Sequence, residues 1–551
     1  MPKQKRTWPS ALVALLVITL TVGLLPARAQ VATNDTTITV TGGGWGHGVG
    51  MSQYGAYGRA SAGDTHEEIL SFYYPGSVLT ELDATDDLRI HLHSARGTRV
   101  LPSQDPEHSG DIEIVDGEGN RIYNSRNGRE LTVRKVDGGF RVMRPTNSGG
   151  NRNLCIDDDD VDRCQVDEIR LRFVQGEPIE VNGIDRVSVG TSGNSYRWGE
   201  LAIYDRTFDD TDRTLWVVLE ELGMDQYLYG LAEVPKSWPA EVLKSQVVAA
   251  RTYAFDRATS RRANPGRDVP WDLFSTVDDQ VYYGYGNETG TYGPVWLEAV
   301  DDTSGNVLLY DGEPITAFYS SSNGGWTEES GYVFVTSLPY LTANRDRHDD
   351  FRNPYASWSR DYTGDELGAW LASSSIGGVG SVVDVQITGN IGRSGRVDKA
   401  TVEITGTEGT VTTTGNRFRI AVNAGVARAG GGLSRQLLST KFAVTTLGGA
   451  EPVGAVDRVK RRQTGNVRIA GWVFDPDIDA SVNVEIRVDD EAIHTVLADQ
   501  SRFDIDAVFG EGTSRGFDVV LPIDNTVAHQ VCVYADNIGP GGQMLLGCQV
   551  V

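Results

Sequence analysis

Apolar positions in the middle of the chain follow a helical period. Leu243, Val247, Ala250 and Ala254 recur at spacings of four and three residues, so they form one buried stripe on a helix. Pro239 suits the first turn of this helix, where a missing backbone N–H is no loss. The pattern predicts a helix of about five turns.

A shorter helix is predicted just before it, over Tyr227 to Leu231. The Val234–Pro235 step should end this helix, because a residue before proline avoids the helical region. Glu233 therefore lies at a stiff joint between two helices, with Tyr229 and Trp238 close in sequence. A carboxyl group held there partly out of water meets the requirement for a catalytic acid. A solvated carboxylate without a role is the alternative for a lone Glu before Pro.

Alternation of apolar and polar residues predicts strands on both sides of these helices. The section from Leu88 to Val218 has short alternating runs bounded by glycine and aspartate, which is typical of an all-β section. After about Pro452 the pattern changes, and Val482 to Val488 alternates strictly. About a hundred residues of such strands predict a small β-sandwich. Attachment and simple spacing are both open as its role.

The segment from Gly42 to Ala56 is dense in glycine and includes a Trp and a His. Glycine lets the backbone adopt conformations closed to other residues and lets a ligand approach closely. The segment is not a phosphate-binding loop, since the Gly-Lys-Ser/Thr ending is missing. A flexible linker also fits badly, because Thr65 and Glu68 form a predicted capping box that opens a helix ending at Pro75.

Composition limits the classes of partner. The chain has 551 residues, of which 39% are hydrophobic, and this is enough for two to four domains with real cores. Its formal net charge of −25 argues against nucleic acid, because phosphate binding needs a surplus of Lys and Arg. The charge also argues against simple electrostatic adhesion to anionic polymers. An exported protein with an acidic surface is the interpretation we favour.

Residues 1–29 are predicted to be a secretory signal peptide. Basic residues precede an apolar run from Ala11 to Leu25, and a small-x-small cleavage site follows before Gln30. The mature chain then has no membrane span, because no second apolar run of spanning length follows. An uncleaved anchor is the alternative.

Four cysteines in an exported chain are expected to be paired, and four cysteines allow three connectivities. We predict the pairs that are local in sequence, Cys155 with Cys164 and Cys532 with Cys548. On the chain-entropy model each bond stabilises the fold by about 2–3 kcal/mol.

Five aspartates, Asp157 to Asp160 and Asp162, lie inside the first disulfide loop. Such a cluster raises the question of calcium. The spacing of an EF-hand, with its central Gly and terminal Glu, is absent. A solvated acidic loop closed by a disulfide is the interpretation we favour.

The stretch from Asp225 to Ala254 resembles the signature of the SpoIID/LytB family of sporulation- and autolysis-linked cell-wall proteins. The shared pattern runs Tyr-Leu, Gly, an acid before Pro, Trp-Pro, Glu, Leu-Lys-x-Gln and Ala-Ala-Arg-Thr-Tyr-Ala. The resemblance implies a lytic transglycosylase that acts on peptidoglycan glycan strands, with Glu233 as its catalytic group. This chain departs from the pattern at Val234, where Met is common, and in a shorter joint.

The segment from Gly46 to Ala56 is similar to a second element of the same family, which is thought to lie near the active-site groove. In family members this element follows the last strand of the domain, whereas here it comes first. Residues 395–442 resemble the strands that normally precede it. A permuted domain and an added copy of the loop both explain this order. If the fold brings them together, the loop borders the same groove as Glu233.

The resemblance also implies a set of residues that contact the glycan. These residues are Gln246, Arg251 and Tyr253 on the central helix and His47, Ser52 and Gln53 on the glycine loop. Three of them have structural alternatives. Arg251 could form a surface ion pair, Tyr253 could pack in the core, and His47 could bond a backbone carbonyl to hold the loop.

Some family members bind zinc through Cys and His in two later stretches. Here Ser320, Asn323 and Trp326 stand in one stretch, and Asp278 and Asp279 stand in the other. Because the soft ligands of zinc are missing, we predict no metal and no cofactor.

The expected reaction needs one carboxyl group in two roles. Protonated Glu233 donates to the glycosidic oxygen between N-acetylmuramic acid and N-acetylglucosamine, and the carboxylate then takes the proton of the muramic C6 hydroxyl as an anhydro ring closes. The expected partners are peptidoglycan strands and, as a further candidate, a cell-wall amidase. The alternative function is a non-catalytic glycan-binding protein or amidase enhancer in cell-wall remodelling. Either protein would be secreted to the wall.

Together these predictions give an α+β fold, in which a mixed SpoIID-like domain precedes a C-terminal all-β sandwich. The predicted parts are the signal peptide (1–29), the SpoIID/LytB-like domain (30–450) and the sandwich (452–551). Inside the second part lie the glycine loop (42–56), a β-rich section (86–218), a catalytic helical section (222–260) and a β-rich closing section (300–445).

Overall fold

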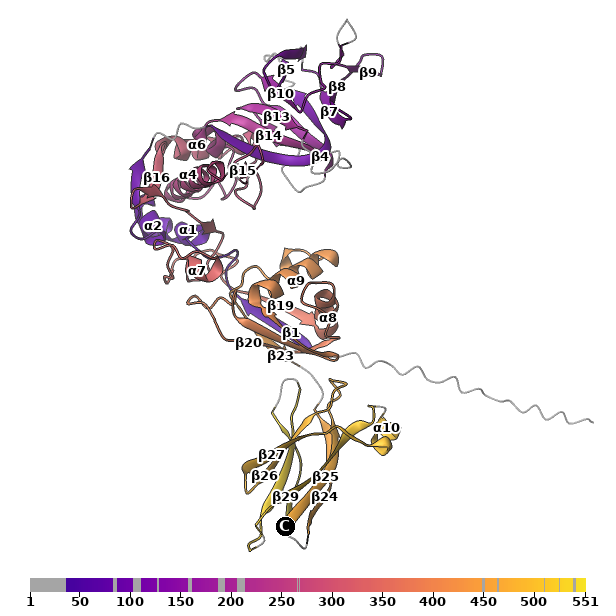
Figure 1. Ribbon diagram of the computed structural model, residues 1–551. Coiled ribbons are helices and arrows are strands. Elements are labelled where there is room, and N and C mark those ends of the chain that lie inside the picture. Colours follow the sequence, from indigo (N-terminus) through magenta and orange to yellow (C-terminus); the bar gives the residue numbers. More distant parts are fainter. Residues whose placement is uncertain are drawn as a thin grey trace, which may run out of the picture.

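The computed structural model describes residues 36–82, 87–102, 111–125, 128–156, 161–186, 194–205, 214–264, 266, 268–447, 451–462, 465–509, 511–524, 526–538 and 542–551. The predicted signal peptide and Asp157 to Asp160, on which the calcium question rests, lie outside these residues. No helix within the described part of the chain is long and apolar enough to cross a bilayer. The fold is mixed α+β, as predicted (Figure 1).

The N-terminal strand lies inside a sheet made from much later residues. Strand β1 (Thr37–Gly42) pairs antiparallel with β19 (Trp358–Thr363) on one side and with β23 (Phe442–Leu447) on the other. In Figure 1 the indigo β1 lies among orange strands. Alternation in β1 turns Ile38 and Val40 inward, and both are fully buried. The sheet therefore places the glycine loop, which follows β1, close to residues from much later in the sequence.

A second small sheet and two helices share this core. The sheet consists of β20 (Val382–Thr388), β21 (Thr401–Gly406) and β22 (Gly409–Thr414), and the helices are α8 (Gly364–Ala372) and α9 (Gly415–Arg428). A short 3₁₀ turn, Leu433–Arg435, follows α9. Thr363 and Glu366 form a capping box that begins α8.

The central helices are α3 (Met224–Tyr229) and α4 (Ala240–Arg262). Pro239 is the N-cap of α4, and the predicted apolar stripe of this helix is buried. The prediction that α4 begins at the proline is confirmed.

The end of the shorter helix was predicted too late. Helix α3 stops at Tyr229 rather than at the Val234–Pro235 step, because the chain after it forms backbone contacts with another segment. Leu231 forms a β-bridge with Tyr282, and Ala232 N–H donates to the Val281 carbonyl at 2.8 Å. These contacts, together with the prolines, fix the joint that carries Glu233.

The other helices surround the central pair. They are α1 (Gln53–Ala62), α2 (His66–Tyr73), α5 (Tyr285–Glu288), α6 (Gly293–Asp302) and α7 (Ser330–Val333). The predicted capping box of Thr65 and Glu68 is present at the start of α2. That helix ends before Pro75, as predicted.

A large sheet, antiparallel except for the short parallel strand β15, is formed mainly by the section predicted to be all-β. Among the described residues its strand order is β6-β5-β10-β13-β14-β4-β7-β8-β9, with β11, β12 and β15 off this path. The bounds are β4 (Leu88–Pro102), β5 (Ile112–Asp116), β6 (Arg121–Ser125), β7 (Leu131–Val136), β8 (Gly139–Pro145), β9 (Asn151–Asn153), β10 (Glu168–Phe173), β11 (Ile179–Arg186), β12 (Asn194–Tyr196), β13 (Glu200–Tyr204), β14 (Leu215–Leu222) and β15 (Leu273–Phe274). Its core is continuous with that of α4 and α6.

Burial of His91 in β4 makes the stability of this sheet sensitive to acid. The side chain is 5% exposed, and burial together with the neighbouring His93 lowers the pKa of His91 from 6.5 to about 4. The unfolded state therefore binds more protons than the folded state between these two values. We expect the free energy of unfolding to fall by about 3 kcal/mol as the pH falls from 6.5 to 4.

Denaturant unfolding at pH 7 and pH 4 measures this loss. A His91→Leu variant should lose less stability over the same range, and His494→Gln, which changes an exposed histidine, should behave like the wild type. Equal acid sensitivity of the wild type and His91→Leu would contradict the assignment.

Two small sheets join the glycine loop region to the later chain. One consists of β3 (Val78–Glu81), β16 (Asn306–Tyr310) and β17 (Glu313–Pro314). In the other, β2 (Met51–Ser52) pairs parallel with β18 (Tyr319–Ser320). The second pairing brings the end of the glycine loop beside Tyr319.

The C-terminal residues form two antiparallel sheets with one shared core cluster. One sheet has the order β24 (Val453–Arg461), β25 (Asn466–Phe474), β29 (Ser514–Pro522) and β28 (Gln500–Ser501). The other has the order β27 (Glu491–Leu497), β26 (Asn483–Val488), β30 (Gln530–Ala535) and β31 (Met544–Val550). Helix α10 (Phe503–Phe509) lies between β28 and β29 in sequence. The alternating residues of β26 turn Val484 and Ile486 into the core.

Candidate active site

Glu233 lies between α3 and α4 on the wall of a cavity of about 580 Å³. The backbone N–H of Val281 donates to Glu233 Oε1 at 2.6 Å. Burial raises the pKa of the Glu233 carboxyl to about 7, and hydrogen bonds from Val281, Tyr319 and Gln53 oppose the rise because they favour the carboxylate. Near neutral pH the group is therefore protonated in about half of the molecules.

Buried hydrogen bonds aim the Tyr319 hydroxyl at Glu233. Gln280 Nε2 donates to the Ala250 carbonyl at 3.3 Å and to Tyr319 Oη at 2.8 Å, while Tyr227 Oη donates to Gln280 Oε1 at 3.1 Å. Because a carbonyl only accepts, these contacts give the Gln280 amide a single orientation. The Tyr319 oxygen thus accepts from Gln280, and its own proton is directed to the Glu233 carboxylate. This series of hydrogen bonds was not predicted, because the residues that form it are far apart in the sequence.

The glycine loop forms part of the cavity wall. Its Gly46 pairs with Ser439 in a β-bridge, and β2 follows it. Gly50 has φ +72°, and a Cβ there would lie 2.0 Å from the Phe318 carbonyl oxygen. Only glycine lets the two segments touch in this way. The loop therefore borders the same cavity as Glu233, as the sequence led us to expect.

His47 lines the cavity, but its ring nitrogens are engaged with backbone. Val49 N–H donates to His47 Nδ1 at 3.0 Å, and the ring also hydrogen-bonds the backbone of Tyr319. Burial and the Arg396 cation lower the pKa of His47 to about 4, so the ring is neutral at neutral pH. These backbone contacts support the alternative role of His47, in which the side chain holds the loop.

Arg396 is hydrogen-bonded to the glycine loop. It was not among the residues predicted from the sequence. Its side chain is fully buried, and Nη1 donates to the Gly46 carbonyl at 3.0 Å and to Thr440 Oγ1 at 3.2 Å. A Cβ on Gly48 would collide with the guanidinium. Arg396 can therefore approach the loop this closely only because residue 48 is a glycine.

Of the neighbouring polar residues, Gln53 reaches the cavity, whereas Ser52 and Gln246 are not among its lining. Gln53 Nε2 donates to the fully buried Gln246 Oε1 at 3.2 Å, which orients Gln53. Ser52 caps α1 by accepting from Gly55 N–H at 3.0 Å and donates to Asp349. Ser52 and Gln246 thus lie behind residues of the wall and support them through these hydrogen bonds.

Tyr253 and Arg257 line the cavity one helical turn apart on α4. Tyr253 Oη donates to Asp279 Oδ1 at 3.2 Å, and the Arg257 guanidinium carbon lies 5.1 Å from the centre of the Tyr253 ring. Asp279 is in turn ion-paired with Arg261 at 2.6 Å. Arg257 was not predicted, although its i+4 spacing from Tyr253 on the predicted helix was a usable signal.

Arg251, which was predicted to contact the glycan, is not among the residues that line the cavity of Glu233. Its side chain is 1% exposed and lies on another side of α4. Nη2 donates to Asp225 Oδ1 at 2.7 Å, and Nη1 donates to the carbonyls of Thr303 at 2.6 Å and Asn306 at 3.3 Å. Arg251 therefore ties α4 to α3 and to the end of α6.

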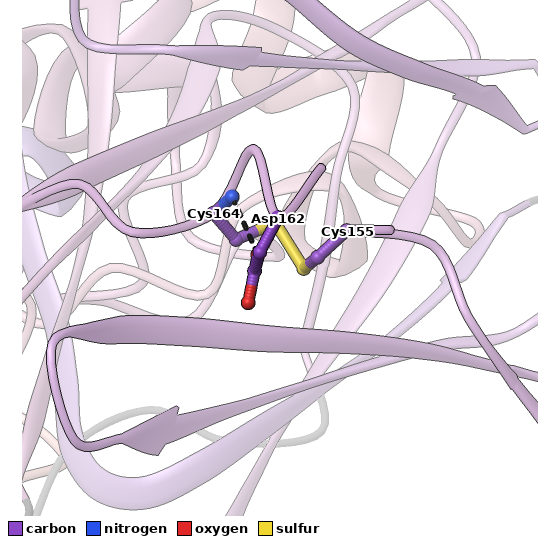
Figure 2. A group of neighbouring side chains, drawn as sticks. All are labelled: Cys155, Asp162 and Cys164. Atoms are coloured by element: carbon purple, nitrogen blue, oxygen red, sulfur yellow. Dashed lines mark hydrogen bonds between the residues drawn. A yellow bond between two sulfur atoms is a disulfide. The ribbon is translucent and has the colours of Figure 1, made fainter. Parts of the chain in front are cut away.

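Both predicted disulfides are present. Cys155 is bonded to Cys164, and Cys532 is bonded to Cys548. Figure 2 shows the first bond with Asp162, whose Oδ1 accepts from Cys164 N–H at 3.0 Å. The two sulfurs are consumed by the bond, so this group offers a metal no thiolate.

The residues at the positions of the family's zinc ligands have other partners. Ser320 Oγ accepts from Gly48 N–H at 3.2 Å, and Asn323 Nδ2 donates to Asp346 at 2.9 Å. Trp326 forms a β-bridge with Arg345. Asp278 lies exposed at the cavity rim, beside the ion-paired Asp279.

Within the described residues, a further group with the spacing of metal ligands lies away from the cavity lining. It consists of His66, Glu67 and Glu241. His66 Nδ1 lies 2.8 Å from Glu241 Oε2, and His66 N–H donates to the same oxygen at 2.7 Å. The contact joins α2 to the first turn of α4.

Several known proteins are similar to part of the chain. The amidase enhancer of Bacillus subtilis (strain 168) is 43% identical over 127 residues, which are 23% of this chain and 15% of that protein. Stage II sporulation protein D of the same strain is 49% identical over 183 residues, or 30% of this chain and 52% of that protein. A stage II sporulation protein D of Bacillus amyloliquefaciens is 29% identical over 136 residues, or 22% and 38%. The chain thus spans about half or less of the length of these relatives.

The family model SpoIID, described as stage II sporulation protein, matches residues 212–310. This part of the chain is therefore a SpoIID-like region. The matched SpoIID region contains Glu233, α3, α4 and α6. The glycine loop and Tyr319 lie outside the matched range, yet both contact the Glu233 cavity.

Proposed function

We propose that this protein is an exported peptidoglycan lytic transglycosylase with Glu233 as its single acid and base. The observation that carries the proposal is a carboxyl group with a pKa raised to about 7 on the wall of a 580 Å³ cavity. A group with this pKa serves as donor and acceptor at neutral pH with little bias. The family relationship supports cell-wall remodelling as its setting.

In the proposed reaction, the Glu233 carboxyl donates its proton to the glycosidic oxygen as the bond from that oxygen to the muramic C1 breaks. The C6 hydroxyl oxygen then bonds to C1, and its proton returns to the Glu233 carboxylate. The carboxyl is regenerated, and no water is consumed. Val281 N–H, Tyr319 and Gln53 stabilise the carboxylate between the two transfers.

The other carboxyl groups of the cavity wall differ from Glu233. Asp279 is neutralised by Arg261, and Asp278 is exposed to solvent at the rim. A hydrolase with two carboxylates needs a second group poised to act as a base or nucleophile. The arrangement favours the single-carboxyl route, in which the substrate's own hydroxyl group is the nucleophile.

A second function also has support. A relative that is 43% identical over its matched region is named an amidase enhancer. On this model the cavity would hold a glycan strand for a cell-wall amidase without cleaving it. Digestion of peptide-free glycan strands by the purified protein, followed by mass spectrometry, separates the two functions. Release of anhydro-muramyl ends supports cleavage, and intact strands that bind the protein support the enhancer.

Tyr319→Phe tests the hydrogen bond to the proposed acid. Removing this donor destabilises the carboxylate, so we expect strand cleavage to slow about tenfold. Activity requires protonated Glu233 at the start, and it should decline as the pH rises above about 7 in the wild type. The loss of the donor raises the pKa of Glu233, so this decline should move to higher pH in Tyr319→Phe.

The matched control is Tyr229→Phe, because the Tyr229 hydroxyl donates to Asp301 and does not line the cavity. Its pH profile should match that of the wild type. A slower Tyr319→Phe enzyme with an unmoved pH profile would mean that the hydroxyl acts on packing and not on Glu233.

A further inference from the structure

Aromatic side chains form a continuous row that starts at the cavity wall and ends at the surface. The members of this aromatic row, in order of contact, are Trp45, Tyr355, Tyr54, Trp238, Tyr57 and Phe351. Trp45 lines the cavity that contains Glu233. Successive ring centres lie 4.5, 5.9, 5.1, 4.7 and 5.4 Å apart.

Each side chain of the row is at least partly exposed to solvent. None of its members is buried, and Phe351 at the far end is 37% exposed. The aromatic side chains of the neighbouring core behave differently, since Trp296 and Tyr227 are fully buried. Exposed apolar surface that is continuous with a cavity is typical of a binding site.

The far end of the row also carries a strained polar residue. Arg352 has φ 50°, a backbone conformation that costs a side-chain-bearing residue about 1 kcal/mol or more. Its guanidinium lies 5.5 Å from the centre of the Phe351 ring, and Nη1 lies 3.5 Å from Tyr57 Oη. The strained backbone therefore places a hydrogen-bond donor beside the exposed end of the row.

We propose that the aromatic row binds sugar rings of a glycan strand that extend beyond the cavity. A pyranose ring presents C–H groups on its faces and hydroxyl groups at its rim, so it packs on an aromatic surface while a flanking donor binds a hydroxyl group. A polymer substrate continues outside the cavity where one linkage is cleaved. The inference rests on the proposed function, because it names the surface that holds the rest of the strand.

The row has a second effect, since it packs α1 against the start of α4 through Tyr57 and Trp238. The test must therefore change the exposed end and leave this packing in place. Phe351→Ala removes an exposed ring. Arg352→Gly removes the donor and suits the positive φ, so it relieves strain instead of adding it.

Binding is measured in full-length protein carrying Glu233→Gln, so that cleavage does not interfere. The probes are chitooligosaccharides of two and six N-acetylglucosamine units. We expect the hexamer to bind more tightly than the dimer. Combining Phe351→Ala with Arg352→Gly should weaken hexamer binding about tenfold and leave dimer binding within about twofold. Phe503→Ala, which removes an exposed phenylalanine outside the row, should change neither.

Unchanged hexamer affinity in the double variant, with an unchanged melting temperature, would overturn the proposal and leave the row a packing device. A drop in melting temperature with equal loss of dimer and hexamer binding would overturn it as well. The outcome is independent of the proposed reaction. The wild-type protein could cleave no strands and still bind the hexamer more tightly than the dimer in a way that depends on the row. That result would refute the lytic function and support the sugar-binding row.

Discussion

Replacing Glu233 by glutamine is expected to reduce release of anhydro-muramyl products by at least about a thousandfold. The amide keeps the shape of the side chain, and its oxygen can still accept from Val281 N–H. It has no proton to donate to a glycosidic oxygen and no carboxylate to receive one. Product release from peptide-free strands, measured by mass spectrometry, is the readout.

The same variant has a stability signature that checks its folding. The raised pKa of Glu233 means that the folded state binds the proton more tightly than the unfolded state, so its contribution to stability is full below about pH 4.5 and is lost as the pH rises through about 7. The glutamine side chain does not ionise, so the Glu233→Gln variant does not lose stability as the pH rises. It should unfold at a higher temperature than the wild type at pH 8. A well-folded variant that still releases products at the wild-type rate would refute the assignment of the acid.

The second large effect is expected at Arg251, on stability and not on chemistry. Arg251→Met keeps much of the apolar stem but removes the hydrogen bonds that Arg251 donates to Asp225 and to the carbonyls of Thr303 and Asn306. Arg251 is buried but Asp225 is 33% exposed, so losing these hydrogen bonds is expected to cost about 2–3 kcal/mol. We expect that loss in denaturant unfolding of the region around α4, with cleavage per folded molecule unchanged.

Arg257→Met is the matched control, because Arg257 lies on the same helix but lines the cavity. This variant should lose glycan affinity with a change in unfolding free energy below about 1 kcal/mol. The opposite pattern, with lost glycan binding in Arg251→Met and lost stability in Arg257→Met, would restore Arg251 as the glycan contact.

Local signals predicted the parts of the structure that local chemistry decides. The capping box at Thr65 and the proline before α4 act on the residues next to them, and both elements begin as predicted. The end of α3 was missed because Leu231 pairs with Tyr282, a partner that no nearby residue reveals.

The same distinction between local and distant contacts applies to the candidate site. The joint that holds Glu233 could be located from the spacing of prolines and apolar residues. The position of Arg251 could not be predicted, because only the packing of α4 decides which face of the helix lines the cavity, whereas the i+4 spacing of Arg257 from Tyr253 did place these two residues on one face. Tyr319 and Arg396 gave no signal at all, since their contacts join segments separated by many residues.

The position of β1 between β19 and β23 has a consequence for how the protein matures. Its pairing partners are synthesised more than three hundred residues after it, and long-range pairing of this kind folds slowly. Glu233 and every other residue that lines its cavity are translated before β19 and β23. A chain released before β19 would carry these residues but lack both strands that pair with β1, so the glycine loop would lose the support of its own sheet.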